Sequence, residues 1–210
     1  GQPKVPAGPA VYSVNTSKKL IALTFDDGPN GAHTDAILSV LAKHKVHATF
    51  FVLGQNSARD GARLRKEAAA GHAIGNHGWD HAQLTNLSSS QVRSQLSRTS
   101  DKIEQITGKR PDTFRAPYGA RNSSVDAVAR SLGLRDILWD VDTVDWRRPG
   151  SAAITNEAVS SARTGSIILM HDGGGDRSQT AKSLDGTITR LQAKGYQFVT
   201  VPQLMAASGK

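Results

Sequence analysis

The stretch Thr24-Phe25-Asp26-Asp27-Gly28-Pro29 places two adjacent carboxylates directly after an apolar run, Leu20 to Leu23. An apolar and β-branched run that stops at Gly-Pro is typical of a buried strand followed by a sharp turn. Two neighbouring carboxylates repel each other, so both stay ionised only where a cation lies close to them. The sequence therefore predicts a metal ion or an arginine beside Asp26 and Asp27.

The composition limits the ligands and partners. The chain has 210 residues and no cysteine, so any metal must be held by histidine and carboxylate. The net charge of +8 would suit an acidic polymer, a bacterial wall or nucleic acid. The basic residues are scattered, however, and only 5% of all residues are aromatic, so we expect no nucleic-acid partner.

The distribution of apolar residues indicates whether the chain has a membrane-spanning segment or a signal peptide. No apolar run approaches the roughly 20 residues that span a bilayer, so we expect no membrane partner. Residues 1–9 lack the charged and apolar pattern of a signal peptide and resemble a trimmed mature end. We therefore expect a chain from which a signal peptide has been removed.

Strand-like runs alternate with segments of helical spacing along the whole chain. Ile37 and Leu41 lie four positions apart in the first helical segment, and Ser88 with Gln91 forms a capping-box pattern before a long helix. Such alternation, with glycines at the helix ends, predicts a parallel sheet covered by helices, either doubly wound or closed into a barrel. Strands are expected at residues 20–25, 47–53, 72–76, 113–115, 136–141, 166–170 and 197–201.

The positions of the unusual residues favour the barrel. In a closed barrel every strand end opens onto one face, whereas an open sheet gathers only the ends near its switch point. We therefore expect a distorted (β/α) barrel of about seven parallel strands, similar to a TIM barrel. The residues concerned are Asp26 and Asp27 after the first strand, His77 and His81 after the third, Arg115 at the end of the fourth, Asp142 and Asp145 after the fifth, and His171 after the sixth.

His77 and His81 are candidates for the metal ligands. Their spacing of four would place both imidazoles on one face of a helical turn. With one carboxylate they would form a facial set of two imidazoles and one carboxylate, which leaves positions open for water and substrate. We therefore expect one bound divalent metal ion.

Five motifs in this order resemble those of the polysaccharide deacetylases, carbohydrate esterase family 4. The match covers about Lys19 to Leu204, nearly the whole chain. The resemblance implies one polysaccharide deacetylase catalytic domain over residues 1-210, with an N-terminal extension over 1-18. The motifs are Thr24-Phe25-Asp26-Asp27-Gly28-Pro29, His77-x-x-x-His81, Arg115-Ala116-Pro117-Tyr118-Gly119, Asp142-x-x-Asp145-Trp146 and Leu169-Met170-His171.

The resemblance implies roles for the charged residues. Asp27 would bind the metal together with His77 and His81, and the metal would be zinc, although other divalent transition metals would also fit. Asp26 would act as the general base, and Arg115 would keep it ionised so that it can take a proton from water.

Other residues would stabilise the oxyanion and protonate the amine that leaves. The resemblance implies that the backbone N–H of Tyr118 donates to the oxyanion formed when water attacks an acetamide. His171 would protonate the leaving amine, because imidazole titrates near neutrality and its expected partner, Asp145, would raise its pKa.

Three apolar residues are candidate substrate contacts. Leu169 resembles the family's contact to the acetate methyl and Trp146 the aromatic wall of its groove, although either side chain could simply be packing in the core. Trp79, between the two histidines, would reach the groove. The chain departs from the usual motifs at Gly78 and Ala116, which affects the stiffness of the loops rather than a ligand.

We therefore predict a metal-dependent enzyme that removes N-acetyl groups from N-acetylglucosamine units of chitin or chitooligosaccharides and releases acetate. The nearest alternatives keep the chemistry and change the polymer: a peptidoglycan N-acetylglucosamine deacetylase or an acetylxylan esterase. A glycan-binding protein without catalysis is a remote alternative, because it would be expected to lack a ligand or the base. A phosphate-ester hydrolase would need more ligands and arginines. The expected partner is a β-1,4-linked N-acetylglucosamine polysaccharide or oligosaccharide, and we expect a secreted, monomeric, bacterial enzyme.

Overall fold

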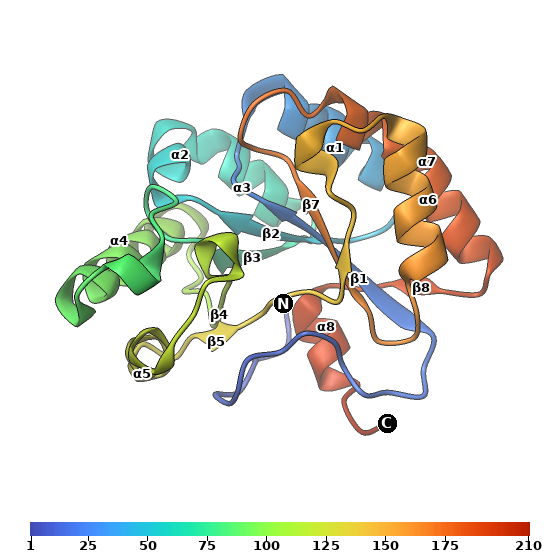
Figure 1. The fold of residues 1–210 in the computed structure, drawn as a ribbon. Helices are drawn as coiled ribbons and strands as arrows, with labels where there is room; N and C mark the ends of the chain where they lie inside the picture. The colour runs from blue at the N-terminus through green and yellow to red at the C-terminus, as the bar shows by residue number, and fades with distance from the viewer.

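The computed structural model describes residues 1–210 and contains one curled, parallel sheet flanked by helices (Figure 1). The strand order is β5-β4-β3-β2-β1-β7-β6, and β8 pairs separately with β1. This arrangement confirms the predicted α/β fold, a distorted barrel of about seven parallel strands, and the sheet curls into a half-barrel. The strands are β1 Leu20–Asp26, β2 Thr49–Val52, β3 Ala73–Asn76, β4 Thr113–Phe114, β5 Arg135–Asp136, β6 Val141–Asp142, β7 Ile167–His171 and β8 Gln197–Phe198.

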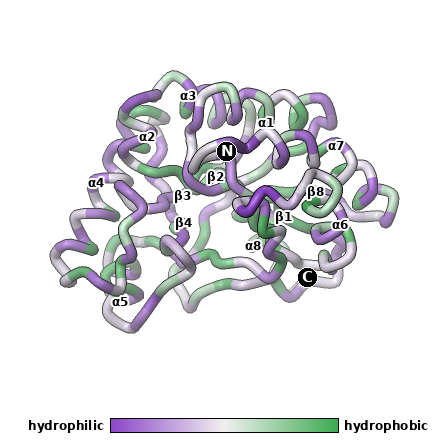
Figure 2. The backbone as a smooth tube through the Cα atoms, turned by 45° about the horizontal axis from the view of Figure 1, so that its top comes forward, coloured by the Kyte–Doolittle hydropathy of each residue, from purple (hydrophilic) through white to green (hydrophobic).

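Most helices cover one face of the sheet, and a short helix near the C-terminus, α8, covers the other. Figure 1 shows α1, α6 and α7 beside the end of the curled sheet that holds β1 and β7, and α4 and α5 beside the end that holds β3 to β5. Figure 2 shows hydrophobic residues along the central strands and hydrophilic stretches on the outer turns of the helices. No helix is both long enough and apolar enough to cross a membrane. The helices are α1 Gly31–Lys43, α2 Gly54–Arg59, α3 Gly61–Ala69, α4 Ser89–Thr107, α5 Ser123–Ser131, α6 Ser151–Ser161, α7 Ser178–Ala193 and α8 Val201–Ala206.

The strand β1 is the centre of the sheet and is buried on both faces. Leu23 and Phe25 belong to the large apolar cluster that includes Ile37 of α1 and Leu184 of α7. Ala22, which points to the opposite face, belongs to a second cluster. A parallel strand that is buried on both faces needs a nearly continuous apolar sequence, which Leu20 to Leu23 and Phe25 provide, while the hydroxyl of Thr24 donates to the carbonyl of Ile168.

One short segment supplies both edges of the sheet. β5 pairs with β4, and β6 pairs with β7, so the predicted single strand at 136–141 is two strands with different neighbours. Between them Leu138 donates its N–H to the carbonyl of Val11 over 2.7 Å. Residues 1–18, predicted as an extension, therefore contribute to the barrel, and Val11 is buried there.

Side chains that cap helices set two boundaries in the fold. Asp60 separates α2 from α3, because its side chain accepts a hydrogen bond from the N–H of Arg63 and begins α3. The last strand stops at Phe198 because Thr200 forms a capping box that begins α8. The predicted capping box at Ser88 is confirmed.

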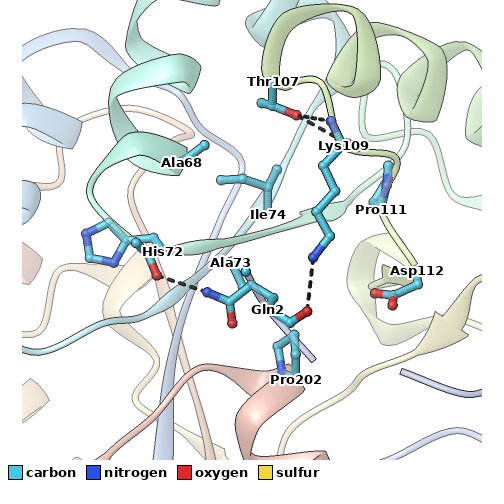
Figure 3. Close-up of a pocket in the computed structure, with 12 residues that line it drawn as sticks. Gln2, Ala68, His72, Ala73, Ile74, Thr107, Lys109, Pro111, Asp112 and Pro202 are labelled. Carbon is cyan, nitrogen blue, oxygen red and sulfur yellow. Dashed lines mark hydrogen bonds between the residues drawn. The ribbon is translucent and has the colours of Figure 1, made fainter. Parts of the chain in front are cut away.

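A pocket of about 260 Å³ lies near the amino end of β3 (Figure 3). Gln2 reaches across it and donates from its amide to the carbonyl of Gly71 over 3.0 Å, while the Lys109 ammonium donates to the Gln2 carbonyl over 3.4 Å. None of the predicted site residues lines this pocket.

Candidate active site

The predicted site residues meet at the carboxyl ends of the strands, around a cavity of about 400 Å³. The strand β1 ends at Asp26 and β7 ends at His171, and residue 26 pairs directly with residue 171. Trp79 does not line this cavity, so its predicted contact with substrate has no support from the structure. The predicted residues that do line it are Asp26, Asp27, His77, His81, Tyr118, Trp146, Leu169 and His171.

Asp27, His77 and His81 form a cluster that could hold a metal ion. One atom from each lies within 4.8 Å of the others. Oδ1 of Asp27 is 3.1 Å from Nε2 of His77 and 3.3 Å from Nε2 of His81. The same Oδ1 is buried and has no hydrogen bond of good geometry. A buried carboxylate oxygen without a donor, faced by two imidazole nitrogens, fits the donor set of a divalent metal.

The tautomer of His77 strengthens this argument. Its Nδ1 is 2.6 Å from the carbonyl oxygen of Arg115, which can only accept, so Nδ1 carries a proton. In the neutral ring Nε2 then has a lone pair that faces the carboxylate of Asp27. A cation, either a proton or a metal ion, is needed between these two atoms, and binding of a metal would release the proton.

The charges of Asp27 and His81 also suit a metal site. Burial would raise the pKa of Asp27, but the close approach of His77 and the charges of His77, His171 and His81 hold it below its usual range. Burial lowers the pKa of His81, which favours a neutral ring. Metal ligands must be deprotonated, so both residues are suited to the role.

The backbone that carries these ligands differs from the predicted helical turn. His77 and His81 lie in a loop, where Gly78 has φ 80° and His81 has φ 67°. Asp27 also has a positive φ, 79°. A non-glycine residue in the left-handed region is uncommon and often marks a functional site. The glycine at position 78 is explained by its own positive φ.

Asp26 is paired with the buried guanidinium of Arg115. Nη1 of Arg115 donates to Oδ1 of Asp26 over 2.7 Å and to the hydroxyl of Thr24 over 2.8 Å. Its other nitrogens donate to the carbonyls of Ile137 and Leu138 over 2.8 and 2.9 Å. Arg115 is fully buried, and a buried charge needs such a set of partners. The second oxygen of Asp26 faces the metal-ligand cluster.

His171 and Asp145 form a second pair across the same cavity. Nδ1 of His171 is 2.7 Å from Oδ1 of Asp145, and the backbone N–H of His171 donates to Oδ2 over 2.7 Å. Thr180 donates its hydroxyl to the same Oδ2. Burial alone would lower the pKa of His171, but Asp145, with the charges of Asp26 and Asp27, raises it to about 9. His171 is therefore protonated at neutral pH.

Tyr118 contributes a free backbone donor. It has φ 65° in the turn η2 Pro117–Gly119, and its N–H donates to no other backbone group. The residue is 66% exposed, and the centre of its ring lies 4.5 Å from the centre of the His81 ring. Beneath this turn the N–H of Ala116 donates to the buried carboxyl of Asp136 over 3.4 Å.

The apolar lining is only partly as predicted. Leu169 is 4% exposed and forms part of the cavity wall, while Trp146 is 48% exposed at its mouth. Trp139 also lines the cavity, and Gly119 leaves no room between the turn and its ring. Trp79 instead packs against Gly54, where an added Cβ would lie 2.3 Å from its ring.

Arg177 was missed by the sequence prediction. It lines the cavity, is 6% exposed, and donates from Nε to the carbonyl of Gly173 over 2.7 Å and from Nη2 to that of Gly174 over 3.0 Å. The only signal in the sequence is the run Gly173-Gly174-Gly175 after the last motif, which indicates a loop that passes close to other backbone.

A curled parallel sheet of α/β type carries, at the carboxyl ends of its strands, an Asp-His-His cluster that could hold a metal ion. Comparisons with known proteins identify the class of enzyme that shares this fold. The family model described as polysaccharide deacetylase matches residues 13–137. The chain belongs to the polysaccharide deacetylase family, which confirms the resemblance seen in the motifs.

Several relatives are peptidoglycan deacetylases. The chain is 42% identical over 196 residues to the peptidoglycan-N-acetylglucosamine deacetylase PgdA of Listeria monocytogenes, covering 93% of this chain and 41% of that protein. It is 37% identical over 202 residues to a peptidoglycan-N-acetylglucosamine deacetylase of Bacillus cereus, covering 95% of this chain and 94% of that protein. A chitooligosaccharide deacetylase of Azorhizobium caulinodans is 36% identical over 201 residues, with 90% and 96% covered. The chain thus spans about two fifths of the Listeria relative.

Solved structures share the fold. The Bc1960 peptidoglycan N-acetylglucosamine deacetylase, in complex with an N-hydroxybenzamide, superposes with a TM-score of 0.92 at 34% identity, covering 96% of this chain and 94% of that one. A protein of Bacillus anthracis described as a pseudoenzyme of the CE4 family has a TM-score of 0.90 at 29% identity, with 97% and 71% covered. Because the fold is shared with a pseudoenzyme, the argument for catalysis rests on the site residues.

Proposed function

We propose that this protein removes N-acetyl groups from N-acetylglucosamine units of peptidoglycan and releases acetate. The observation that carries the chemistry is the Asp27, His77 and His81 cluster, which shares one cavity with the Asp26–Arg115 pair and the His171–Asp145 pair. The Bacillus cereus relative, matched over nearly its whole length, supports peptidoglycan over chitin, the substrate predicted first. The chitooligosaccharide deacetylase, matched over a similar share, supports chitooligosaccharides as the second candidate.

The proposed metal is zinc, held by Asp27, His77 and His81. When bound there, a divalent ion would polarise the acetamide carbonyl and lower the pKa of water. The Bc1960 relative was solved with an N-hydroxybenzamide, and the hydroxamate group of such compounds is a metal chelator, which supports a metal in the shared site.

The residues of the chain perform the proton transfers. Asp26, paired with Arg115 through Oδ1, accepts a proton from the attacking water through Oδ2, which faces the cluster. The N–H of Tyr118 donates to the former carbonyl oxygen as negative charge develops on it. His171 then gives its proton to the amine as the carbon–nitrogen bond breaks. Asp145 holds the proton on Nδ1, so the transferable proton is the one on Nε2.

The apolar wall shields this chemistry from water. Leu169 and Trp139 give the cavity an apolar wall against which an acetyl methyl can pack, whereas Trp146 at the mouth offers an aromatic face on which a sugar ring can stack. We also propose that the chain acts as one catalytic domain, as a monomer and outside the cell, where a β-1,4-linked N-acetylglucosamine polymer is reached.

A panel assay tests the proposal. Acetate release is measured on peptidoglycan strands, chitooligosaccharides and acetylxylan, with and without a chelator. We expect release that stops with chelator and returns with zinc, and the highest kcat/KM on peptidoglycan. Activity that persists in chelator would contradict the metal site. Equal activity on all three polymers would contradict the choice of substrate but leave the reaction in place.

A further inference from the structure

Two exposed arginines follow Trp146 at the mouth of the cavity. The guanidinium carbon of Arg147 lies 4.8 Å from the centre of the Trp146 ring, and Arg148 comes next in the chain. Both arginines are exposed, and Trp146 is itself half-exposed. A sugar that stacks on Trp146 would therefore lie beside positive charge.

Neither arginine is neutralised by the protein. The ion pairs of arginine involve Arg63, Arg110, Arg115, Arg121 and Arg163. Asp176 is near enough to feel the charge of Arg148 but makes no ion pair with it. The other acidic side chains nearby are engaged, since Asp142 accepts from the N–H of Val144 and Asp145 from His171.

A third arginine lies behind this segment. Nη1 of Arg177 is 3.5 Å from the carbonyl oxygen of Trp146, to which it donates, and Arg177 also lacks a carboxylate partner. The backbone of this segment is in the left-handed region at two positions, since Val144 has φ 54° and Arg148 has φ 52°. A positive φ is costly for a β-branched residue and persists only where the surroundings impose it. We call Trp146, Arg147, Arg148 and Arg177 the arginine edge.

We propose that the arginine edge is a subsite for a carboxylate on the sugar next to the one that is deacetylated. This inference rests on the proposed action on peptidoglycan. There the carboxylate comes from the lactyl group of muramic acid or, where that group is in amide linkage, from the stem peptide. A guanidinium binds a carboxylate through two parallel hydrogen bonds, and Arg147 and Arg148 have donors free for this. Chitin, which is neutral, would leave them unpaired.

The double variant Arg147→Gln/Arg148→Gln tests the subsite. The readout is the ratio of kcat/KM on carboxylate-bearing strands to kcat/KM on a neutral chitooligosaccharide. Because the variant loses two exposed ion pairs, we expect this ratio to fall by about 10-fold. Raised salt should also lower the ratio of the wild-type enzyme. Strands whose carboxylates are converted to amides should behave as the neutral substrate does.

Two substrate arms separate the sources of the carboxylate. Strands without stem peptide carry the free lactyl group, and strands with stem peptide carry only the peptide carboxylates, so the arm on which the ratio falls identifies the source. The control variant is Arg98→Gln, which removes a guanidinium stacked 4.0 Å from the ring of Trp79, outside the cavity. It should leave the ratio unchanged.

The outcomes distinguish this inference from the proposed function. An unchanged ratio in the double variant, or an equal fall with Arg98→Gln, would overturn the subsite while acetate release continued. Absence of acetate release from every substrate by the wild-type enzyme would instead overturn the proposed function. Thermal unfolding of each variant checks that the exposed substitutions leave the fold intact.

Discussion

Asp26 and Asp27 are neighbours in the chain, but their carboxylates have different partners. Oδ1 of Asp26 is 2.7 Å from Arg115, while Oδ1 of Asp27 is 3.1 Å from His77. Consecutive side chains of an extended strand point to opposite faces. The left-handed backbone at Asp27, with φ 79°, breaks that alternation and lets both carboxylates reach one cavity. Asp26 is thus paired with an arginine, and Asp27 with two imidazoles, rather than both with one cation.

Replacing Asp26 by Asn should remove the base and keep the metal ligands. We expect kcat for acetate release to fall by about 10³-fold, since a general base contributes roughly 10² to 10⁴. Zinc binding, measured by titration of the metal-free protein, should persist. Activity close to that of the wild type would show that another group takes the proton.

Arg115 should stabilise the fold as well as the base. Arg115→Met leaves Asp26 buried without its partner, so we expect a loss of about 3–5 kcal/mol in the free energy of unfolding, measured in urea. Arg121→Met removes an ion pair with Asp126 that is partly exposed and serves as the control. It should cost at most about 1 kcal/mol. Similar losses for both variants would show that burial of the Arg115 pair is not what matters.

The pH profile should depend on Asp145. His171 is protonated below its pKa of about 9, so kcat/KM should fall as the pH rises through that value. Asp145→Asn removes the charge that raises the pKa, and the alkaline limb should move to lower pH. Asp142→Asn, which alters a carboxylate that does not contact His171, should leave the limb in place. An alkaline limb that is identical in Asp145→Asn would rule out His171 as the acid.

His72 should make stability depend on pH. Burial, with a smaller effect of His47, lowers the pKa of His72 from 6.5 to about 4, and its Nδ1 accepts from the N–H of Ala48. The imidazole of His72 therefore binds a proton more readily in the unfolded chain than in the folded one. The contribution of the neutral ring to the free energy of unfolding is fully present above pH 6.5 and is lost as the pH falls toward 4. The difference corresponds to about 3 kcal/mol.

His72→Gln measures this contribution. Its free energy of unfolding should vary less than that of the wild type between pH 6.5 and about 4. Above pH 7 the two proteins should show parallel pH dependence, which is the internal control. Parallel curves over the whole range would show that the proton of His72 is not linked to folding.

Gly173 should affect the affinity for zinc only through its close packing against the backbone of Asp27. An added Cβ would lie 2.0 Å from the carbonyl oxygen of Asp27, so Gly173→Ala must displace the backbone of a ligand. We expect zinc affinity to fall by about 10-fold, equivalent to about 1.4 kcal/mol. Gly186→Ala, in α7 with only ordinary contacts at 3.6 Å, is the matched control and should bind zinc as the wild type does. Equal affinities would show that the loop adapts.

The sequence predicted those parts of the fold that depend on local pattern. The apolar run before Asp26 marks the central strand because it is buried on both faces, and Ser88 with Gln91 marks a helix start because both side chains bond to nearby backbone. The motif residues lie at the carboxyl ends of the strands. Because a barrel brings these ends to one face, the expected fold also predicted that the residues converge.

Other features depend on contacts between distant segments. Arg177 bonds only to backbone carbonyls, which any sequence supplies, so no pattern reveals its partners. The division of the fifth strand depends on which neighbours its two ends meet. Trp139 lies between β5 and β6, where it both packs against an apolar cluster and lines the cavity.

The segment that provides both β5 and β6 should tolerate inserted residues poorly during evolution. Its carbonyls at Ile137 and Leu138 orient Arg115 on the base side, and a few residues later Asp145 holds His171 on the acid side. Proton acceptor and proton donor are thus joined by one spacer of fixed length. Lengthening this spacer by a single residue would shift one partner against the other, whereas outer loops can vary in length without altering the distance between them.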